Sequence, residues 1–440
     1  MIRLNILLLL LLLLFIPKIF GNDDALPNIN KYQYSKIIEV PDLSFVGTVF
    51  SGLDILEQMD FKPLRNKTVA ILTNQSAVNR NNQHLLDILI KYPDIKVKYL
   101  LSMEHGIWST NDKRSKMVGR DGLSPLHKAQ IIDLFKTYLN PPSWVMRDID
   151  LVLVDYQDTG SRYTTYTTTL SKVFESASDF EIPVFILDRP NPIRGDLISG
   201  PIPRSEFQSF ESYHLFPIRH GLTIGEMSLI INEMGWVKDL KRIQLNIIPM
   251  ANWKREMWFE DTQLPWKNFT PHLNTPSSLL AYSGMDLFRG TNLNIGFGTG
   301  APYMVVGSPW LSTSYLLRKL KEQNLPGVTF KEVEYRPIGS TYYKRAPKFD
   351  NLKCSGIELV IRDQNIFMPI ETATSMLILI DQLFPRQFQW EENNYIDKLF
   401  GSNELRTSAA QKKDPNHLPA IWSRDVYKFN EFRQPFLIYK

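Results

Sequence analysis

The chain has 440 residues, enough for two domains of ordinary size, and its 43% hydrophobic and 22% charged content excludes the disordered and fibrous classes. The net charge of +4 at pH 7 falls to +2 when Arg3 and Lys18 are removed with the leader described below. A charge so near neutral argues against nucleic acid as a partner. Cys354 is the only cysteine, which excludes an intramolecular disulfide and predicts a small buried side chain there.

Residues 1–21 have the pattern of a signal peptide. Arg3 precedes an apolar run that ends at about Ile16, which is short for a membrane span, and cleavage is expected near Gly21. An uncleaved N-terminal anchor is the alternative. We therefore expect a secreted or periplasmic protein without stable membrane association after cleavage, in which residues 22–44 form a flexible lead-in.

Residues 45–250 alternate short apolar runs with helix-length amphipathic segments. Near-continuous apolar strands that alternate with helices predict a parallel sheet covered by helices on both faces. The strand-like runs begin at Lys67, Lys96, Asp150 and Ile182, with another at 242–250, and the helical segments lie at 84–90, 129–139, 167–179 and 223–234. The sequence thus predicts an α/β domain.

The pattern changes after residue 250. Residues 251–310 are rich in Trp, Pro, Gly and Asn and show little periodicity. Helical segments at 311–323 and 372–384 then surround strand-like ones at 328–337 and 357–363. We predict a smaller C-terminal α+β domain over residues 251–440, whose first loops contribute to the functional cleft.

Polar or ionisable residues follow the first four predicted strands, and others precede the helix predicted at 223–234. Ligands of an open parallel sheet bind outside the carboxyl ends of its strands, so these residues predict one polar cleft. They are Asn74, Gln75, Glu104, His105, Asp155, Asp158, Arg162, Tyr163, Tyr166, Asp188, Arg189, Asn191, Arg219 and His220.

Glu104 is the strongest catalytic candidate among them. Glutamate is a poor turn former, and at the end of an apolar strand it would be partly removed from water. Partial desolvation favours the protonated carboxyl that a general acid needs. The residue types at this position therefore indicate acid–base chemistry.

Several other residues of the predicted cleft have structural alternatives. Asp155 can cap the next segment or form an ion pair with Arg189. Asn74 and Gln75 can satisfy backbone amides of their loop. His220 precedes a helix, where a histidine is as often structural as catalytic.

Signatures of other chemistries are missing from the sequence. It has no G-x-S-x-G, no H-E-x-x-H and no Cys/His metal spacing, so we expect no metal. GFGTG at 296–300 follows no clear strand and is a weak dinucleotide site, so we expect no cofactor. Carboxylates with aromatic residues suit glycoside hydrolysis. A stacking platform for the sugar can come from Trp253, Trp258 or Trp266, with core packing as the alternative.

Eight segments, in order over roughly residues 45 to 400, resemble the NamZ-like exo-β-N-acetylmuramidases. The resemblance implies a Rossmann-like catalytic domain at 45–250 and a smaller C-terminal domain at 251–440. It also implies release of N-acetylmuramic acid from the non-reducing ends of peptidoglycan fragments, with the family's catalytic glutamate on Glu104 and the neighbouring histidine on His105. The segments are SGLDIL (51–56), TNQSAV (73–78), MEHGI (103–107), DYQDTGSRY (155–163), LDRPNP (187–192), RHGLTIGE (219–226), MWFEDTQLPW (257–266) and FRGTNLNIGFGTGAPYMVVGSPW (288–310).

The chain departs from the family pattern at four positions. Met103 replaces a proline, and Thr164 replaces a tyrosine. Phe297 replaces an arginine, and His272 stands in a motif that reads S-P-N-x-P-T in the family. The last two lie on loops that should reach the cleft. A secreted glycan-binding protein without catalysis, and a hydrolase for a different amino sugar, therefore stay open as alternatives.

The resemblance and the residues together suggest roles. Glu104 would protonate the leaving oxygen of a muropeptide or disaccharide substrate. Asp155 or Asp158 would act as nucleophile, as base for water, or as the group that orients the substrate's acetamide. Muramic acid carries a lactyl carboxylate, so an arginine fork is expected nearby. The candidates are Arg162, Arg189 and Arg219.

Overall fold

The computed structural model describes residues 32–41, 47–108, 128–268, 270–339 and 346–440. The expected leader, its cleavage site and part of the lead-in lie outside these residues. Within the described part of the chain, no helix combines the length and the apolar character needed to span a bilayer.

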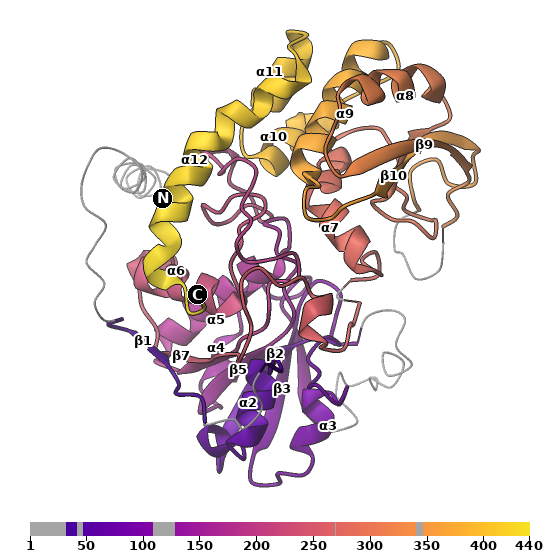
Figure 1. Cartoon of the computed structure of the whole chain (residues 1–440). Coiled ribbons are helices and arrows are strands. Elements are labelled where there is room, and N and C mark those ends of the chain that lie inside the picture. Colours follow the sequence, from indigo (N-terminus) through magenta and orange to yellow (C-terminus); the bar gives the residue numbers. More distant parts are fainter. Residues whose placement is uncertain (1–31, 42–46, 109–127, 269, 340–345) are drawn as a thin grey trace, which may run out of the picture.

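Seven parallel strands form the large sheet, in the order β1-β7-β6-β5-β2-β3-β4 (Figure 1). The predicted fold class is therefore confirmed. The strands are β1 (Ser35–Ile37), β2 (Thr68–Thr73), β3 (Lys96–Ser102), β4 (Gln130–Asp133), β5 (Leu151–Asp155), β6 (Val184–Leu187) and β7 (Leu245–Ile248). Strand β1 lies inside the segment that was expected to be a flexible lead-in.

Helices cover both faces of this sheet, because alternate strand residues point to opposite sides. In β2, Val69 and Ile71 belong to the apolar cluster that contains α2 and α3. Ala70 and Leu72 belong to the cluster that contains α5 and α6. The helices are α2 (Gly52–Gln58), α3 (Leu85–Leu89), α4 (Ser143–Met146), α5 (Tyr166–Asp179) and α6 (Ile224–Glu233).

The helix predicted at 129–139 is wrong, because this segment begins with the edge strand β4. Its isoleucines at 131–132 pair with β3. Asp133 Oδ1 then accepts hydrogen bonds from the two backbone amides at 135 and 136, each at 2.9 Å, and the chain turns. Pairing with a neighbouring strand overrides the weak helical periodicity here.

The second domain has its own antiparallel sheet, in the order β8-β10-β9, and its own apolar cluster. This arrangement confirms the predicted smaller α+β domain (Figure 1). Its elements are α7 (Pro276–Met285), β8 (Val305–Ser308), α8 (Thr313–Glu322), β9 (Val328–Tyr335), β10 (Cys354–Ile361), α9 (Pro369–Leu383), α10 (Tyr395–Phe400), α11 (Glu404–Ala410) and α12 (Leu418–Arg433).

The last helix, α12, returns to the first domain (Figure 1). Phe429 and Phe432 pack in the same apolar cluster as α5 and α6. Arg433 Nη1 donates hydrogen bonds to the carbonyl oxygens of Gly195 and Gly221 at 2.8 and 2.7 Å. The second predicted domain therefore ends with a segment that completes the core of the first.

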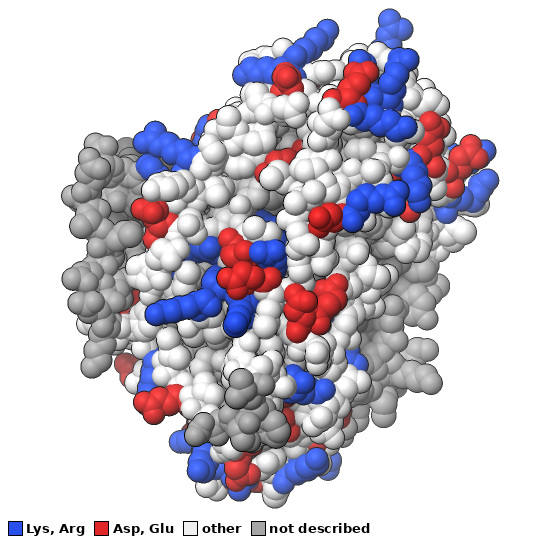
Figure 2. Space-filling model, in the orientation of Figure 1, with Lys and Arg blue, Asp and Glu red and all other residues white. Residues whose placement is uncertain are grey.

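Charged side chains of both signs are interspersed over the face shown in Figure 2. This distribution matches the near-neutral net charge of the sequence.

Candidate active site

Glu104 lies just beyond the carboxyl end of β3, in a turn closed by a hydrogen bond from Gly106 N to Met103 O at 2.9 Å. Gly106 has a φ of 74°, a left-handed value that glycine adopts without strain. The buried Met103 ends the apolar run, and the glutamate and histidine that follow are half-buried. Thr165 Oγ1 donates a hydrogen bond to Glu104 Oε2 at 2.8 Å and so orients the carboxylate.

Tyr166, the first residue of α5, lies beside this carboxylate. Burial raises the pKa of its phenol and the charge of Glu104 raises it further, whereas a hydrogen bond with Asn74 opposes the shift. Asn74 is buried just after β2, and its Oδ1 accepts hydrogen bonds from Ser76 N and Ser76 Oγ at 3.0 and 2.5 Å. The ends of β2 and β3 and the start of α5 therefore meet at one place.

His105 faces the same group of residues. Its ring lies edge-on to the Tyr166 ring, with centroids 6.4 Å apart. Burial lowers the pKa of the imidazole; the charge of Glu104 opposes this shift and the charge of Lys136 adds to it. The neutral imidazole has one nitrogen that donates and one that accepts hydrogen bonds.

Asp158 and His220 form a second buried polar pair in the loops that follow the strands. Asp158 Oδ2 accepts a hydrogen bond from Gly160 N at 2.7 Å and lies 3.4 Å from His220 Nε2. His220 Nδ1 accepts a hydrogen bond from Leu222 N at 3.1 Å, so the proton of the neutral ring is on Nε2 and faces Asp158. Asp158 Oδ1 is buried and has no hydrogen-bond partner among the described residues.

Asp155 is fully buried in an ion pair with Arg189. Nε and Nη2 of Arg189 approach the two carboxylate oxygens at 2.5 and 3.0 Å, and Nη1 and Nη2 also donate to Val78 O, each at 3.1 Å. Burial raises the pKa of Asp155, and the charge of Arg189 opposes the shift. This arrangement favours the ion-pair alternative for both residues.

The other two predicted arginines are also buried and bound to the protein. Arg162 donates to four backbone carbonyls, two of them in α10, at 2.6 to 3.1 Å. It therefore joins the two domains. Arg219 donates to Ile193 O, and its guanidinium lies 5.7 Å from the centre of the Trp258 ring. Burial lowers the pKa of Arg162 and of Arg219 to about 10.

Trp258 and Asn191 hold loops together. Trp258 is buried; its Nε1 donates to Asn365 Oδ1 at 3.0 Å, and the guanidiniums of Arg194 and Arg219 lie over its ring at 5.6 and 5.7 Å. Asn191 Nδ2 donates to a backbone carbonyl at 3.0 Å and its Oδ1 accepts from a backbone amide at 3.1 Å. The Trp258 ring is therefore covered by protein, which favours the packing alternative.

Gln75 and Tyr163 contact the second part of the chain. Gln75 Nε2 donates to Asn268 O at 2.7 Å. Tyr163 is buried in the apolar cluster of the second domain, edge-on to Tyr282 at 6.0 Å. These two residues connect the strand ends with the loops of residues 251–310.

The second domain adds an aromatic wall to the site. The sequence predicted that His272 and Phe297 lie on loops near the cleft, but it did not predict their stacking or the part played by Tyr282 and Tyr303. His272 stacks on Phe297, with ring centroids 4.0 Å apart, Phe297 lies 5.3 Å from Tyr303, and Tyr303 lies 5.0 Å from Tyr282. The charge of Glu104 contributes to the raised pKa of Tyr303, after burial and the larger effect of Asp286 on the same side chain. Thr165 was missed as well. The density of aromatic residues around the glycine-rich loop was the available signal.

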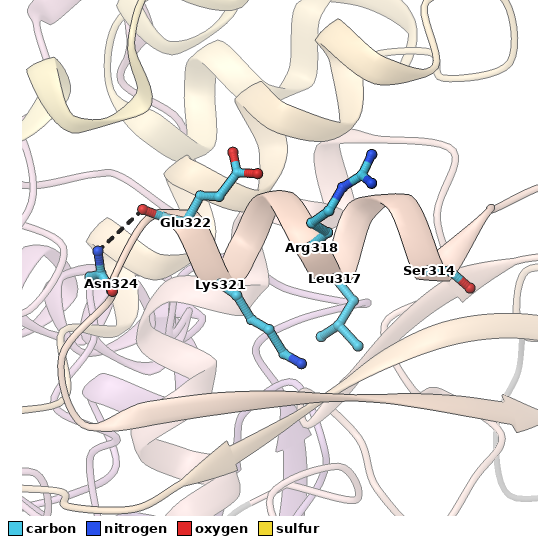
Figure 3. Close-up of a pocket in the computed structure, with 6 residues that line it drawn as sticks. All are labelled: Ser314, Leu317, Arg318, Lys321, Glu322 and Asn324. Atoms are coloured by element: carbon cyan, nitrogen blue, oxygen red, sulfur yellow. Dashed lines mark hydrogen bonds between the residues drawn. The ribbon is translucent and has the colours of Figure 1, made fainter.

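Two other kinds of site, a metal centre and a surface pocket, can be compared with the strand ends. The described residues contain no group of three or more His, Cys, Asp or Glu side chains that could hold a metal ion. A surface hollow of about 450 Å³ runs along α8 of the second domain (Figure 3). Its lining comes from this helix and the turn after it, so it is separate from the strand ends. The lining residues are Ser314, Leu317, Arg318, Lys321, Glu322 and Asn324.

Two family models match nearly the whole of the described chain. Exo-beta-N-acetylmuramidase NamZ, N-terminal, matches residues 69–277, and Exo-beta-N-acetylmuramidase NamZ, C-terminal, matches residues 280–439. The chain belongs to this family. The match confirms the resemblance seen in the sequence, and the two models meet at α7.

Relatives of the chain agree with this assignment. The peptidoglycan β-N-acetylmuramidase NamZ of Bacillus subtilis (strain 168) is 30% identical over 394 residues, which is 89% of this chain and 91% of the relative. A DUF1343 family protein from Bacteroides fragilis NCTC 9343 has a crystal structure with a TM-score of 0.80 and 26% identity, covering 90% of this chain and 100% of that one. The crystal structure of a second DUF1343 family protein from the same organism has a TM-score of 0.71 and 25% identity. The match covers 89% of this chain and 99% of that one.

Proposed function

We propose that this protein is a secreted, exo-acting glycoside hydrolase that releases N-acetylmuramic acid from the non-reducing ends of peptidoglycan fragments. The observation that carries the proposal is the half-buried Glu104 carboxylate, held by Thr165 at the end of β3. Membership in the NamZ family and the similarity to the Bacillus subtilis enzyme support the substrate class. The substrate is a muropeptide or a disaccharide.

Glu104 is the general acid in this proposal. A carboxyl at the strand end protonates the glycosidic oxygen as the bond to the anomeric carbon breaks. The hydrogen bond from Thr165 holds Oε2, which leaves Oε1 to face the substrate. Burial raises the pKa of the Tyr166 phenol, and Tyr166 lies close enough to Glu104 for the charge of that carboxylate to raise it further; the His105 ring lies edge-on to Tyr166.

Asp158 is the better candidate for the second carboxylate. Both oxygens of Asp155 are bound by Arg189, whereas Asp158 has one oxygen held by Gly160 and His220 and one without a protein partner. Asp158 Oδ1 can then accept a proton from water or a hydrogen bond from the substrate's acetamide.

Export is part of the proposal and rests on the sequence of residues 1–21. Cleavage near Gly21 should give a mature protein that begins in the polar segment before β1. Intact-mass analysis of material collected outside the cytoplasm checks this. Exported protein that retains the leader would show an anchor instead.

Hydrolysis is tested with two chromogenic substrates that differ in the lactyl group alone. The mature protein should release nitrophenol from nitrophenyl N-acetyl-β-muramide and leave the matching N-acetylglucosaminide intact. With muropeptide chains as substrate, the product should be free N-acetylmuramic acid. Equal turnover of both glycosides would show a different amino-sugar hydrolase. Binding without turnover would show the glycan-binding alternative.

A further inference from the structure

The loop before α7 lies over the end of β2. Gln75 Nε2 donates a hydrogen bond to Asn268 O at 2.7 Å. The loop is also tied internally, because Trp266 Nε1 donates to Asn268 Oδ1 and Asn268 Nδ2 donates to Asn274 Oδ1, each at 3.2 Å. His272 lies between these anchored positions and is therefore held near the strand ends.

His272 and Phe297 form one stacked pair. Their rings are 4.0 Å apart with an angle of 18° between the planes. These are the two cleft-loop positions at which the chain departs from its family pattern, and in the structure they contact each other. Phe297 in turn lies edge-on to Tyr303 at 5.3 Å, so the second domain presents the His272 ring from a rigid aromatic wall.

The three predicted arginines are already bound by groups of the protein. Arg189 is bound to Asp155, and Arg162 and Arg219 donate to backbone carbonyls. After burial, the charge of Lys136 also lowers the pKa of His105, and the charge of His105 also lowers the pKa of His272, so the two imidazoles lie near each other and near Lys136.

We propose that His105 and His272 together bind the carboxylate of the substrate, and that this histidine pair distinguishes muramic acid from glucosamine sugars. The inference rests on the proposed function, for which the ligand is the lactyl carboxylate on O3 of N-acetylmuramic acid. One histidine comes from the end of β3 and the other from the aromatic wall, so the carboxylate would bridge the two domains. The neutral sugar lacks this group.

The protonation of the two histidines should then depend on whether the carboxylate is bound. Burial lowers the pKa of His272 to about 4, with a further contribution from the charge of His105. Burial also lowers the pKa of His105, with Glu104 opposing and Lys136 adding to the shift. A bound carboxylate stabilises the protonated imidazoles, so binding takes up protons, and affinity for the anionic sugar should rise as the pH falls from about 8 to about 5.

The test is calorimetric binding of free N-acetylmuramic acid and free N-acetylglucosamine to the mature protein at about pH 5 and about pH 8. His272→Phe keeps a ring on Phe297 and removes both nitrogens. It should weaken binding of N-acetylmuramic acid about tenfold or more at the lower pH, as expected for a lost charge-assisted hydrogen bond, and leave N-acetylglucosamine unchanged. His417→Phe is the matched control, since His417 contacts Ser408 of α11, and among the described residues none of its hydrogen-bond partners belongs to the histidine pair or the aromatic wall.

Proton uptake gives a second readout, measured as the dependence of the binding heat on the buffer's ionisation enthalpy. The proposal is supported if the wild type takes up protons when it binds N-acetylmuramic acid and His272→Phe takes up fewer. An unchanged preference and unchanged uptake in His272→Phe would overturn it even if the muramide is hydrolysed. Selective, pH-dependent binding without hydrolysis would support the histidine pair and refute the hydrolase.

Discussion

The phenol of Tyr439, the penultimate residue, donates a hydrogen bond to the buried carboxylate of Asp188 at 2.6 Å. Asp188 follows β6 and also accepts hydrogen bonds from Thr223 Oγ1 and Gly225 N, each at 2.8 Å. The end of the chain thus binds at the start of α6, beside the loops that carry Asp158 and His220. The tail and the sheet form one folded unit.

This contact predicts a pH-dependent stability. Burial raises the pKa of Asp188 to about 7, against the hydrogen bonds it accepts, whereas an unfolded aspartate titrates near pH 3.9. The folded protein therefore holds the extra proton between about pH 4 and pH 7, and the free energy of unfolding should fall as the pH rises through this window. Asp188→Asn should remove on the order of 2–4 kcal/mol of that fall, as measured by urea unfolding at several pH values.

Tyr439→Phe should raise the pKa of Asp188 further. The hydrogen bond from Tyr439 lowers the pKa of Asp188, so its loss should extend the fall in stability above pH 7. Identical pH profiles for the wild type and Asp188→Asn would show that Asp188 is not the group responsible.

Glu104→Gln should separate proton donation from binding. The change is nearly isosteric but removes the titratable proton, so cleavage of substrates with poor leaving groups should slow by about 10²–10⁴-fold. Substrates with a nitrophenolate leaving group need little protonation and should lose much less. Steady-state rates on natural and activated substrates measure the difference.

Asp158→Asn is the comparison for that experiment. The second carboxylate is needed whatever the leaving group, so both substrate types should lose activity together. A Glu104→Gln enzyme impaired equally on both types would assign Glu104 to this second role, and unimpaired activity on both would remove it from the site.

The ion pair of Asp155 and Arg189 should act on stability. Arg189→Met leaves a fully buried carboxylate without its partner, which should cost about 3–5 kcal/mol of unfolding free energy. Lys319→Met breaks the α8 pair with Glu322 and should cost less than about 1 kcal/mol. Denaturant unfolding compares the two, and similar costs would contradict the structural role.

Helix α12 should be needed by the first domain. Phe429 is fully buried in the apolar cluster that contains α5 and α6, with its ring 6.0 Å from that of Phe216, so Phe429→Ala should cost about 3–5 kcal/mol. Tyr427→Ala on the same helix is a matched control, since Tyr427 is 65% exposed and its loss should cost within about 0.5 kcal/mol. Thermal and urea unfolding provide the measurement. A loss for Phe429→Ala as small as that for Tyr427→Ala would show that α12 is dispensable to that core.

Sequence alone determined the features that depend on local pattern. The apolar runs of β2 and β5 predicted buried parallel strands, and Thr223 with Glu226 opened α6 through a capping box, as the helical pattern there predicted. The residue order at 103–106 likewise placed Glu104 at a strand end. These predictions hold in the folded protein because hydrophobic periodicity, helix capping and turn formation each depend on residues only a few positions apart.

Tertiary structure decided what depends on partners far away in the chain. Edge strand β4 forms because β3 offers backbone hydrogen bonds to it. Arg162 joins the two domains because Leu399, 237 positions later in the chain, supplies a backbone carbonyl to its guanidinium. The contact between His272 and Phe297 is of the same kind. Whether a guanidinium, carboxylate or imidazole is bound by protein or left for a ligand depends on which groups the fold brings within hydrogen-bonding distance, and no local pattern records that.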